Sequence, residues 1–357
     1  MTDSASVTQA NAAADPAADH PLPLLVVNDL VKHFTVKGGL FQKGAGKVLA
    51  VDGVSFELAK GETLGIVGES GCGKSTTARV LMRLMAPDSG DVLVKGRQVG
   101  TPTGMSIRDM RYLVQMVFQD SYASLNPRMT IEETIAFGPR AQGVPLEDAR
   151  KRARDLLGQV GLDPNLFIRR YPHELSGGQR QRINIARALA LEPEIVILDE
   201  AVSALDKSVE AQVLNLLMDL KEQLHLTYIF ISHDLNVVHY VSDRVLVMYL
   251  GKVVEIGTVD EIYAETAHPY TRALLSAMPS MDPENRATEP PISGDPPNPI
   301  NPPSGCRFHT RCAHAEALCS QLDPQLHVVD DKSRHYAACH MKIPNSGHSA
   351  AAQRSAS

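Results

Sequence analysis

The chain has 357 residues, of which 43% are hydrophobic and 21% are charged, and its formal net charge at pH 7 is −6. This length and composition predict a sizeable core in two domains, or in one domain with an appendix, and the negative charge argues against a protein that coats nucleic acid. No apolar run is long enough to span a bilayer, and the first 20 residues carry no basic side chain and no long apolar stretch, which excludes a secretory signal.

Residues 1–23 are small, polar and rich in alanine, so they are predicted to form a disordered N-terminal tail. From residue 24 to 277, short β-rich runs alternate with helical stretches, as expected for α/β packing around a mostly parallel sheet. The clearest strand candidates are LGIVG, QMVF, EIVIL and YIFIS. Their nearly continuous apolar runs indicate strands that are covered on both faces.

Each candidate strand ends at residues suited to nucleotide chemistry, namely Gly68, Gln119, Asp199 with Glu200, and Ser232 with His233. In open parallel sheets, ligands bind outside the carboxyl ends of the strands. We therefore expect these four loops to converge on one nucleotide.

The first of these loops is GESGCGKST, residues 68–76, which lies between an apolar strand and a helical pattern. This context is the one that a phosphate-binding P-loop requires. Its glycines let backbone N–H groups turn toward the phosphates, Lys74 reaches the β and γ oxygens, and the Ser75 hydroxyl can ligate Mg²⁺. The expected ATP-binding residues of this loop are Gly68, Ser70, Gly71, Cys72, Gly73, Lys74, Ser75 and Thr76.

Residues 126–178 lack such strands and are rich in helix formers, including EDARKRARDLLGQV, so they are predicted to form a helical subdomain inserted in the core. At the end of this segment stands LSGGQ. Ser176 and Gln179 fit a capping box at the start of the next helix, which places Gly177 and Gly178 in its first turn, where backbone N–H groups are free. Such a helix start can bind an anion, whereas an ordinary capped helix would not explain the two glycines.

Adjacent carboxylates close the EIVIL strand. Asp199 is placed to hold Mg²⁺, and Glu200 to polarise the attacking water. His233 could hydrogen-bond the γ-phosphate and that water. Taken alone, the carboxylates are equally consistent with a solvated acidic turn and His233 with a structural histidine, so these roles depend on the P-loop upstream.

Residues 278–305 are dense in proline and are predicted to form a linker, residues 306–343 a small Cys-rich module, and residues 344–357 a disordered tail. The module holds Cys306, Cys312, Cys319 and Cys339. Four clustered thiols in a cytosolic chain suggest a metal before a disulfide, although their spacing matches no standard zinc or ferredoxin pattern and free thiols stay possible. Nearby histidines also leave mixed zinc ligation open, namely His309, His314, His335 and His340.

The set GESGCGKST, LSGGQ, ILDE, SALD and SHD resembles the nucleotide-binding subunits of ABC transporters. Within that family, SLNPRMT, YPHELSGGQRQR, HPYTRALLSAMP and the tail GCRFHTRC look like the ATP-binding subunits of dipeptide and oligopeptide permeases. The resemblance implies a P-loop ATPase core, with a mostly parallel sheet, an inserted helical subdomain and a C-terminal Cys-rich module. The expected cofactors are ATP and Mg²⁺.

The resemblance also implies roles for single residues. The expected catalytic residues are Glu200, His233, Gln119 and Lys74, with Gln119 as the Q-loop glutamine and His233 as the switch histidine. The Mg²⁺ ligands would be Ser75, Gln119 and Asp199, and Phe34 would stack on adenine. Signature residues Ser176, Gly177, Gly178 and Gln179 would contact ATP held by a partner subunit, beside a D-loop formed by Ser203, Ala204, Leu205 and Asp206.

The same resemblance favours a [4Fe–4S] cluster on Cys306, Cys312, Cys319 and Cys339, with Zn²⁺ as the alternative. It further implies a second, related ABC ATPase subunit, two transmembrane permease subunits and, indirectly, an extracytoplasmic peptide-binding protein. The chain would then be a peripheral protein at the cytoplasmic face of the inner membrane.

The leading hypothesis is therefore an ATPase subunit that drives import of di- or oligopeptides. Nickel complexes or glutathione are alternative cargoes. A soluble ABC ATPase that acts on nucleic acid or ribosomes is a second hypothesis, but it would normally need two cassettes or a long coiled coil, and the chain has one P-loop and no sustained heptads. A metabolic phosphotransferase would leave LSGGQ unexplained, and a redox sensor would make activity follow the state of the Cys module.

Overall fold

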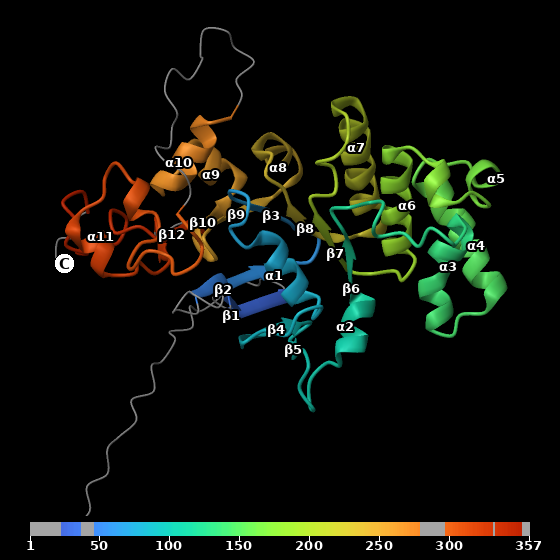
Figure 1. Cartoon of the computed structure of the whole chain (residues 1–357), viewed down its shortest axis with the longest axis horizontal. Helices are drawn as coiled ribbons and strands as arrows, with labels where there is room; N and C mark the ends of the chain where they lie inside the picture. Colours follow the sequence, from blue (N-terminus) through green and yellow to red (C-terminus); the bar gives the residue numbers. More distant parts are fainter. Residues whose placement is uncertain (1–22, 37–45, 279–296, 331–332, 352–357) are drawn as a thin grey trace, which may run out of the picture.

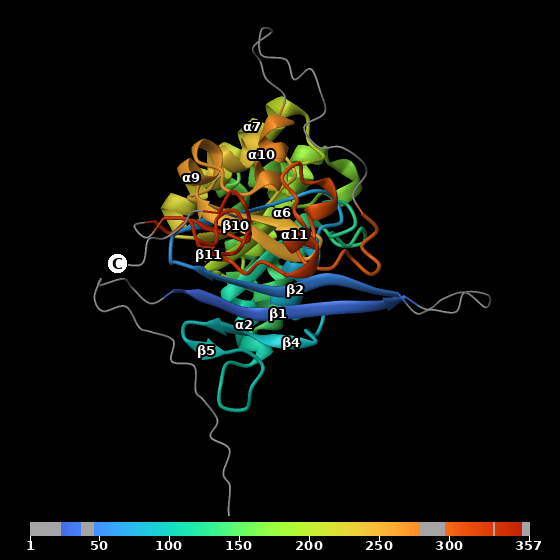
Figure 2. The ribbon, with the colours of Figure 1, turned by 90° about the vertical axis from the view of Figure 1, so that its left-hand side faces the viewer.

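The computed structural model of the chain describes residues 23–36, 46–278, 297–330 and 333–351 (Figure 1). The predicted tail at residues 1–22, much of the predicted linker (279–296) and residues 352–357 lie outside the described residues. Within the described part, two β-sheets lie one below the other, and most helices lie above the larger sheet (Figure 2).

The larger sheet has a parallel centre in the order β9, β3, β8, β7, β6. These strands are β9 (Arg244–Tyr249), β3 (Thr63–Val67), β8 (Thr227–Ile231), β7 (Ile195–Asp199) and β6 (Val114–Val117). The antiparallel strands β10 (Lys252–Thr258), β12 (Tyr336–Ala337) and β11 (His327–Val328) extend the sheet beyond β9. The four strands expected from LGIVG, QMVF, EIVIL and YIFIS are confirmed, each within one residue.

The smaller sheet is antiparallel throughout, which the sequence did not predict. Its order is β2 (Gly46–Leu58), β1 (Leu25–Val36), β4 (Ser89–Val94) and β5 (Arg97–Gln98). The pairing of β1 with β2 contains several register shifts. Such bulges interrupt the alternation of apolar and polar residues by which a strand is detected in a sequence.

Two apolar clusters cover the two faces of the larger sheet. On β7, the fully buried Ile195 and Ile197 face the cluster shared with the smaller sheet, whereas Val196 and Leu198 face the cluster under the helices. This confirms that the continuous apolar runs mark strands covered on both faces. The sheet is consequently a rigid platform for the loops at its strand ends.

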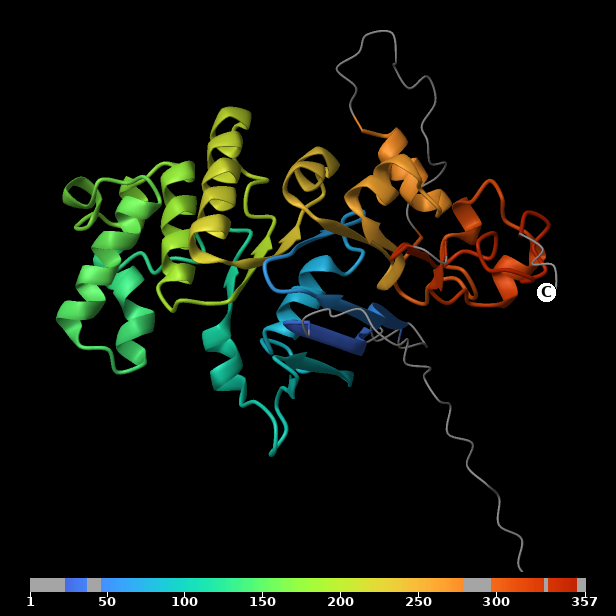
Figure 3. The same cartoon turned by 180° about the vertical axis from the view of Figure 1, so that it is seen from behind.

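Helices α1 (Lys74–Leu81) and α2 (Ile107–Leu113) lie before β6 in the chain. The segment expected to be a helical subdomain forms α3 (Ile131–Ala141), α4 (Leu146–Gln159), α5 (Pro164–Phe167) and the 3₁₀ turn η1 (Pro172–Glu174). The later helices are α6 (Gly177–Leu189), α7 (Lys207–Leu224), α8 (Leu235–Val241), α9 (Val259–Ala264) and α10 (Pro269–Ser276). Helices α3 to α5 lie at one end of the molecule and the C-terminal residues at the other (Figures 1 and 3).

The C-terminal residues contain η2 (His309–Arg311), α11 (Ala317–Gln321) and the short strands β11 and β12. The prediction of a disordered tail from residue 344 is wrong for residues 344–351. His348 is buried, its ring Nε2 lies 2.9 Å from the carbonyl oxygen of His314, and the amide of Ser349 donates to Glu316. The module thus continues to Ala351, because a histidine in this polar stretch packs back onto it.

The described part of the predicted linker also contacts the core. Ile300 forms a β-bridge with Val48 on β2, and the amide of Asn301 donates to the carbonyl of Lys47 at 3.1 Å. The chain therefore crosses the rim of the smaller sheet before it enters the Cys-rich module.

Candidate active site

The candidate site lies at one edge of the larger sheet, where four neighbouring strands end. The P-loop follows β3, Gln119 follows β6, Asp199 and Glu200 end β7, and His233 follows β8. Because β3, β8, β7 and β6 are parallel neighbours, their carboxyl ends meet at the same edge. The expected convergence of these loops is therefore present in the fold (Figure 1).

The P-loop takes a conformation that only glycine accepts easily. Gly68 has φ of +147° and Gly73 has φ of +113°, and a Cβ on Gly73 would lie 2.1 Å from the carbonyl oxygen of Ala50 on β2. At the base of the loop, the buried Lys74 donates from Nζ to the carbonyl oxygens of Gly68 (2.7 Å) and Glu69 (3.1 Å). The ammonium group is thus held inside the curve of the loop, at the start of α1, where phosphate oxygens are expected.

Ser75 and Asp199 form the one pair suited to a divalent cation here. The Ser75 hydroxyl donates to Asp199 Oδ1 at 2.8 Å. Burial raises the pKa of Asp199, and the bond from Ser75 opposes that rise. A hydroxyl and one carboxylate, completed by water and phosphate oxygens, suit the sparse protein ligation of Mg²⁺. In the described parts of the chain, no group of three or more His, Cys, Asp or Glu side chains is arranged to hold a metal.

Glu200 lies between two of the other expected catalytic side chains, Gln119 and His233. Gln119 Nε2 donates to Glu200 Oε2 at 2.8 Å, and His233 Nδ1 lies 3.6 Å from the same oxygen. Glu200 has φ of +48°, and its amide donates to the carbonyl of Ile231 on β8. The strained backbone turns the carboxylate away from the strand and toward Gln119 and His233.

Phe34 lies near the site but is not brought into contact with the P-loop. Its ring is 37% exposed on β1, and Lys32 Nζ lies 5.7 Å from the ring centroid. Phe34 on β1 is paired with Val48 on β2. Val48 is two residues before Ala50, and Gly73 of the P-loop packs against Ala50. This exposed aromatic ring is therefore on the rim of the loop, and its stacking on adenine stays a prediction.

The predicted signature residues lie at the start of α6, apart from the P-loop. Ser176 caps α6 as predicted: its side chain accepts from the amide of Gln179, and the Gln179 side chain accepts from the amide of Ser176. Gly178 packs closely on α7, where a Cβ would lie 2.5 Å from Val209. Three strand spacings of about 4.8 Å separate β3 from β6, the strand that α6 contacts. Within one chain, Ser176 to Gln179 thus do not join the P-loop, whereas Ser203 follows β7 and donates to the carbonyl oxygen of Glu200.

Tyr270 is a further residue at the P-loop that sequence reasoning did not identify as part of the site. Its buried hydroxyl accepts from the amide of Glu69 at 2.9 Å. The only signal was the segment HPYTRALLSAMP, which supported the resemblance but showed no partner. A tyrosine some 200 positions from the P-loop cannot be assigned to it from spacing.

The four cysteines of the C-terminal module line one small cavity. Cys306, Cys312, Cys319 and Cys339 lie around a free space of about 20 Å³, room for about one water molecule. Burial raises the pKa of Cys306 to about 12 and that of Cys339 to about 11. The donor set is rich in sulfur, which suits iron–sulfur and zinc sites, and the thiols must lose their protons to act as ligands.

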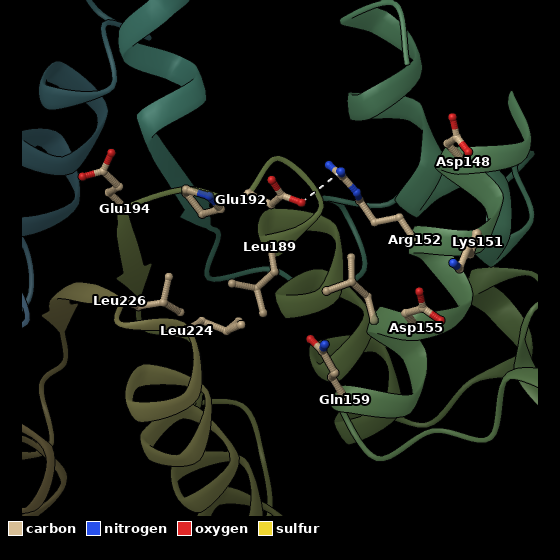
Figure 4. A pocket seen from close by; sticks show the side chains of 12 residues that line it. Asp148, Lys151, Arg152, Asp155, Gln159, Leu189, Glu192, Glu194, Leu224 and Leu226 are labelled. Carbon is tan, nitrogen blue, oxygen red and sulfur yellow. Dashed lines mark ion pairs between the residues drawn. The ribbon is translucent and has the colours of Figure 1, made fainter. Parts of the chain in front are cut away.

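A separate pocket lies elsewhere and contains none of the expected site residues. It has a volume of about 550 Å³ between α4 and the loop that leads into β7 (Figure 4). Its wall carries an ion pair of 2.9 Å between Arg152 and Glu192, above an apolar floor that includes Leu189 and Leu226. This loop precedes β7, so the pocket lies away from the strand ends that carry the candidate site.

No helix in the described ranges has the length and apolar character needed to cross a membrane.

Comparison with known proteins gives matches along most of the chain. The family model described as ABC transporter matches residues 51–203, and the model described as oligopeptide/dipeptide transporter, C-terminal region, matches residues 254–319. The chain is 49% identical over 322 residues to the oligopeptide transport ATP-binding protein AppF of Bacillus subtilis, covering 89% of this chain and 97% of the relative. It is 48% identical over 319 residues to the di/tripeptide transport ATP-binding protein DppF of Pseudomonas aeruginosa, with coverage of 89% and 97%.

Among solved structures, the chain is similar to cbiO1 from Clostridium perfringens, described as part of the ABC transporter complex cbiONQ. The TM-score is 0.58 at 28% identity, and the match covers 68% of this chain and 91% of that chain.

Proposed function

The chain belongs to the ATP-binding proteins of ABC transporters for peptides, and from this premise we propose that its ATP hydrolysis powers the import of di- or oligopeptides through a membrane transporter. The observation that carries the proposal is the convergence of Lys74, Ser75, Asp199 and Glu200 at one sheet edge, inside a P-loop ATPase fold.

The proposed chemistry is positioning and charge neutralisation around a transferred phosphoryl group. Lys74 would bind the β and γ oxygens, and the Ser75–Asp199 pair would hold Mg²⁺, which neutralises phosphate charge. Glu200 would orient and polarise the attacking water, with Gln119 fixing its carboxylate and His233 close to the same oxygen. Phe34 would stack on the adenine from the rim.

The remaining motif residues act in the proposal across a dimer of ATPase subunits. Because Ser176 to Gln179 lie apart from the chain's own P-loop, they would contact the ATP of a second, related subunit, with the loop from Ser203 to Asp206 beside it. ATP would close the two subunits and hydrolysis would reopen them. The inserted helices α3 to α5 would form a helical subdomain.

The proposed partners also include two transmembrane permease subunits and, indirectly, an extracytoplasmic peptide-binding protein. The chain would sit at the cytoplasmic face of the inner membrane. In the C-terminal module, Cys306, Cys312, Cys319 and Cys339 would ligate a [4Fe–4S] cluster, with Zn²⁺ as the alternative. Such a group would supply a covalent centre for a module that is too small to form a large core.

Transport in vesicles tests the proposal directly. The chain would be co-expressed with its permease subunits and the second ATPase subunit, purified and placed in proteoliposomes with the binding protein on the substrate side. Uptake of labelled di- and oligopeptides would be compared with uptake of nickel complexes and glutathione. ATP-dependent peptide uptake that stops with Lys74→Ala supports the proposal. Uptake of nickel or glutathione alone would keep the ATPase but overturn the cargo. Co-purification with RNA in place of permease subunits would favour the nucleic-acid alternative.

A further inference from the structure

Arg311, in the C-terminal module, contacts the P-loop. Both terminal nitrogens of its guanidinium contact the carboxylate of Glu69, at 2.9 Å and 3.1 Å. The Arg311 side chain is only 7% exposed, and Glu69 is 23% exposed. A paired fork of this kind is among the stronger and more directional ion pairs, and its burial keeps solvent from screening it.

Every polar group of Glu69 has a hydrogen-bond partner. Its amide donates to the Tyr270 hydroxyl, and its carboxylate accepts from Arg311. Its carbonyl oxygen accepts from Lys74 Nζ and, at 3.2 Å, from the amide of Cys72. The residue therefore links the C-terminal module to the lysine that is proposed to bind phosphate. Arg311 and Lys74 contact the same residue, one at its carboxylate and the other at its carbonyl oxygen.

A second arginine ties the same module to the rim of the site. Arg307 pairs with Asp52 on β2 and donates to the carbonyl of Leu250. Asp52 also contacts His33 Nε2 at 2.8 Å, next to Phe34 on β1. Arg307 precedes the 3₁₀ turn η2 and Arg311 is its last residue, so the segment between Cys306 and Cys312 is anchored both to the rim strand β2 and to the P-loop.

An aromatic contact keeps this turn in place. The ring of Phe308 lies 5.4 Å from the ring of Tyr249 and 5.4 Å from that of Tyr270, the residue whose hydroxyl meets Glu69. Phe308 is buried. Its packing fixes the direction from which Arg311 approaches the P-loop.

We propose that Arg311 is a positioning residue for ATP binding, through which the Cys-rich module sets the charge and the shape of the P-loop. Glu69 belongs to the loop that is proposed to hold the phosphates, where an unpaired carboxylate would repel them. Arg311 neutralises that carboxylate and holds the Glu69 side chain in place. The inference rests on the proposed binding of ATP at the P-loop. It gives the C-terminal module a role in the ATPase cycle that is separate from the cargo.

The test is a double-mutant cycle of Arg311 and Glu69 in the full chain. The dissociation constant of Mg-ATP and kcat are both measured. Arg311→Gln leaves Glu69 negative and unpaired, so the dissociation constant is expected to rise about tenfold, equivalent to about 1.4 kcal/mol, and to change more than kcat. Adding Glu69→Gln removes the repelling charge, and the double variant is expected to bind ATP several-fold more tightly than Arg311→Gln alone.

A matched control is Asp323→Asn. Asp323 pairs with Lys252 on β10, so it also joins the module to the core, but it does not touch the P-loop. It is expected to lower the melting temperature and leave the dissociation constant for ATP at the wild-type value.

The outcomes separate the possible roles. An unchanged dissociation constant in Arg311→Gln overturns the inference, and so does a double variant that is as weak as the single variant, since both results would mean that Arg311 only stabilises the fold. An effect of Asp323→Asn as large as that of Arg311→Gln overturns it too. Failure of the wild-type chain to bind ATP would overturn the proposed function first, and the inference with it.

Discussion

Glu200 is the residue on which hydrolysis is expected to depend most directly. Replacing Glu200 with Gln keeps the hydrogen bond to the Gln119 side chain available but removes the negative charge that polarises water. We expect kcat to fall by about 10² to 10⁴-fold while ATP still binds, because a lost general base affects the chemical step and not the phosphate contacts of Lys74. Steady-state hydrolysis and equilibrium ATP binding measure the two effects.

Undiminished hydrolysis by this variant would remove Glu200 from the reaction. Loss of ATP binding would instead mean that the carboxylate supports the shape of the site. The variant Gln119→Ala provides a comparison, because it frees Glu200 from its partner without changing the charge of Glu200.

His268, which precedes α10 and lies beside Phe308, is expected to make the stability of the folded chain depend on pH. The ring is fully buried, and this burial lowers its pKa to about 4 against an opposing effect of Glu255. Its Nδ1 accepts from the amide of Tyr270, so the folded state needs the neutral ring. The unfolded chain binds this proton near pH 6.5, and stability is therefore expected to be constant above pH 6.5 and to fall as the pH drops toward 4, by on the order of 3 kcal/mol.

Thermal unfolding of the full chain between pH 4 and 8 measures this effect. His268→Asn retains a side chain that can cap α10 and cannot titrate, so it should flatten the curve. The groups that face the ring must stay unchanged in the comparison: Glu255 and, beyond it, His335, whose Nε2 lies 2.7 Å from Glu255 Oε1. If His268→Asn loses as much stability at low pH as the wild-type chain, the effect belongs to the pair of Glu255 and His335 and not to His268.

At the scale of elements, variants of α6 can separate two roles of Ser176, the helix cap and the proposed contact with ATP. Ser176→Ala removes the cap and is expected to cost about 1 kcal/mol of stability. It should also lower ATPase activity by about 10- to 100-fold, because the hydroxyl that is proposed to contact a partner's phosphate is lost. Unfolding and hydrolysis are both measured, together with ATP binding to the isolated chain, which should persist.

The control is Thr130→Ala, since Thr130 forms the same capping box with Glu133 at the start of α3. Both variants lose a cap, and only Ser176→Ala should lose hydrolysis beyond the effect of stability. Equal loss of activity in the two variants would mean that α6 matters for folding alone.

The elements that the sequence predicts well are those whose signal is local. Strands β3, β6, β7 and β8 are continuous apolar runs, and the Ser176–Gln179 box is three residues long. The smaller sheet was not predicted because β1 and β4 pair across more than 50 residues and the pairings of β1 contain bulges. Strands β11 and β12 have two residues each and exist only because β10 offers them an edge.

For the candidate site, the sequence could place Lys74, Asp199, Glu200, Gln119 and His233 at strand ends, and parallel strand order then brings the ends together. It could not show Tyr270 or Arg311, because neither lies in a motif with a fixed spacing to the P-loop. The position of the proposed catalytic residues at strand ends was thus predictable, and the position of Tyr270 and Arg311 beside the P-loop was not.

At the scale of the whole molecule, the metal content of the C-terminal module is open to measurement. We expect the anaerobically purified chain to contain iron and acid-labile sulfide, and the variant with Cys306→Ser and Cys312→Ser to lose both, because these thiols line the same cavity as Cys319 and Cys339. Metal and sulfide analysis per chain measures this directly.

The matched control is Cys72→Ser, which changes the fifth cysteine, located in the P-loop and outside the module. It should retain the metal. Zinc in place of iron would keep a metal module of another kind, and a wild-type chain without metal would remove the cluster from the proposal.

The pairing of Glu69 with Arg311 also has a consequence for the order of events during synthesis. The two residues are 242 positions apart, so the P-loop leaves the ribosome long before the side chain that neutralises it. At about 5 to 20 residues per second, the delay is roughly 10 to 50 s. During that interval the nascent chain carries a P-loop with an unpaired carboxylate, and it gains full affinity for ATP only when its last segment has folded. Unfinished or truncated chains would therefore compete poorly for cellular ATP.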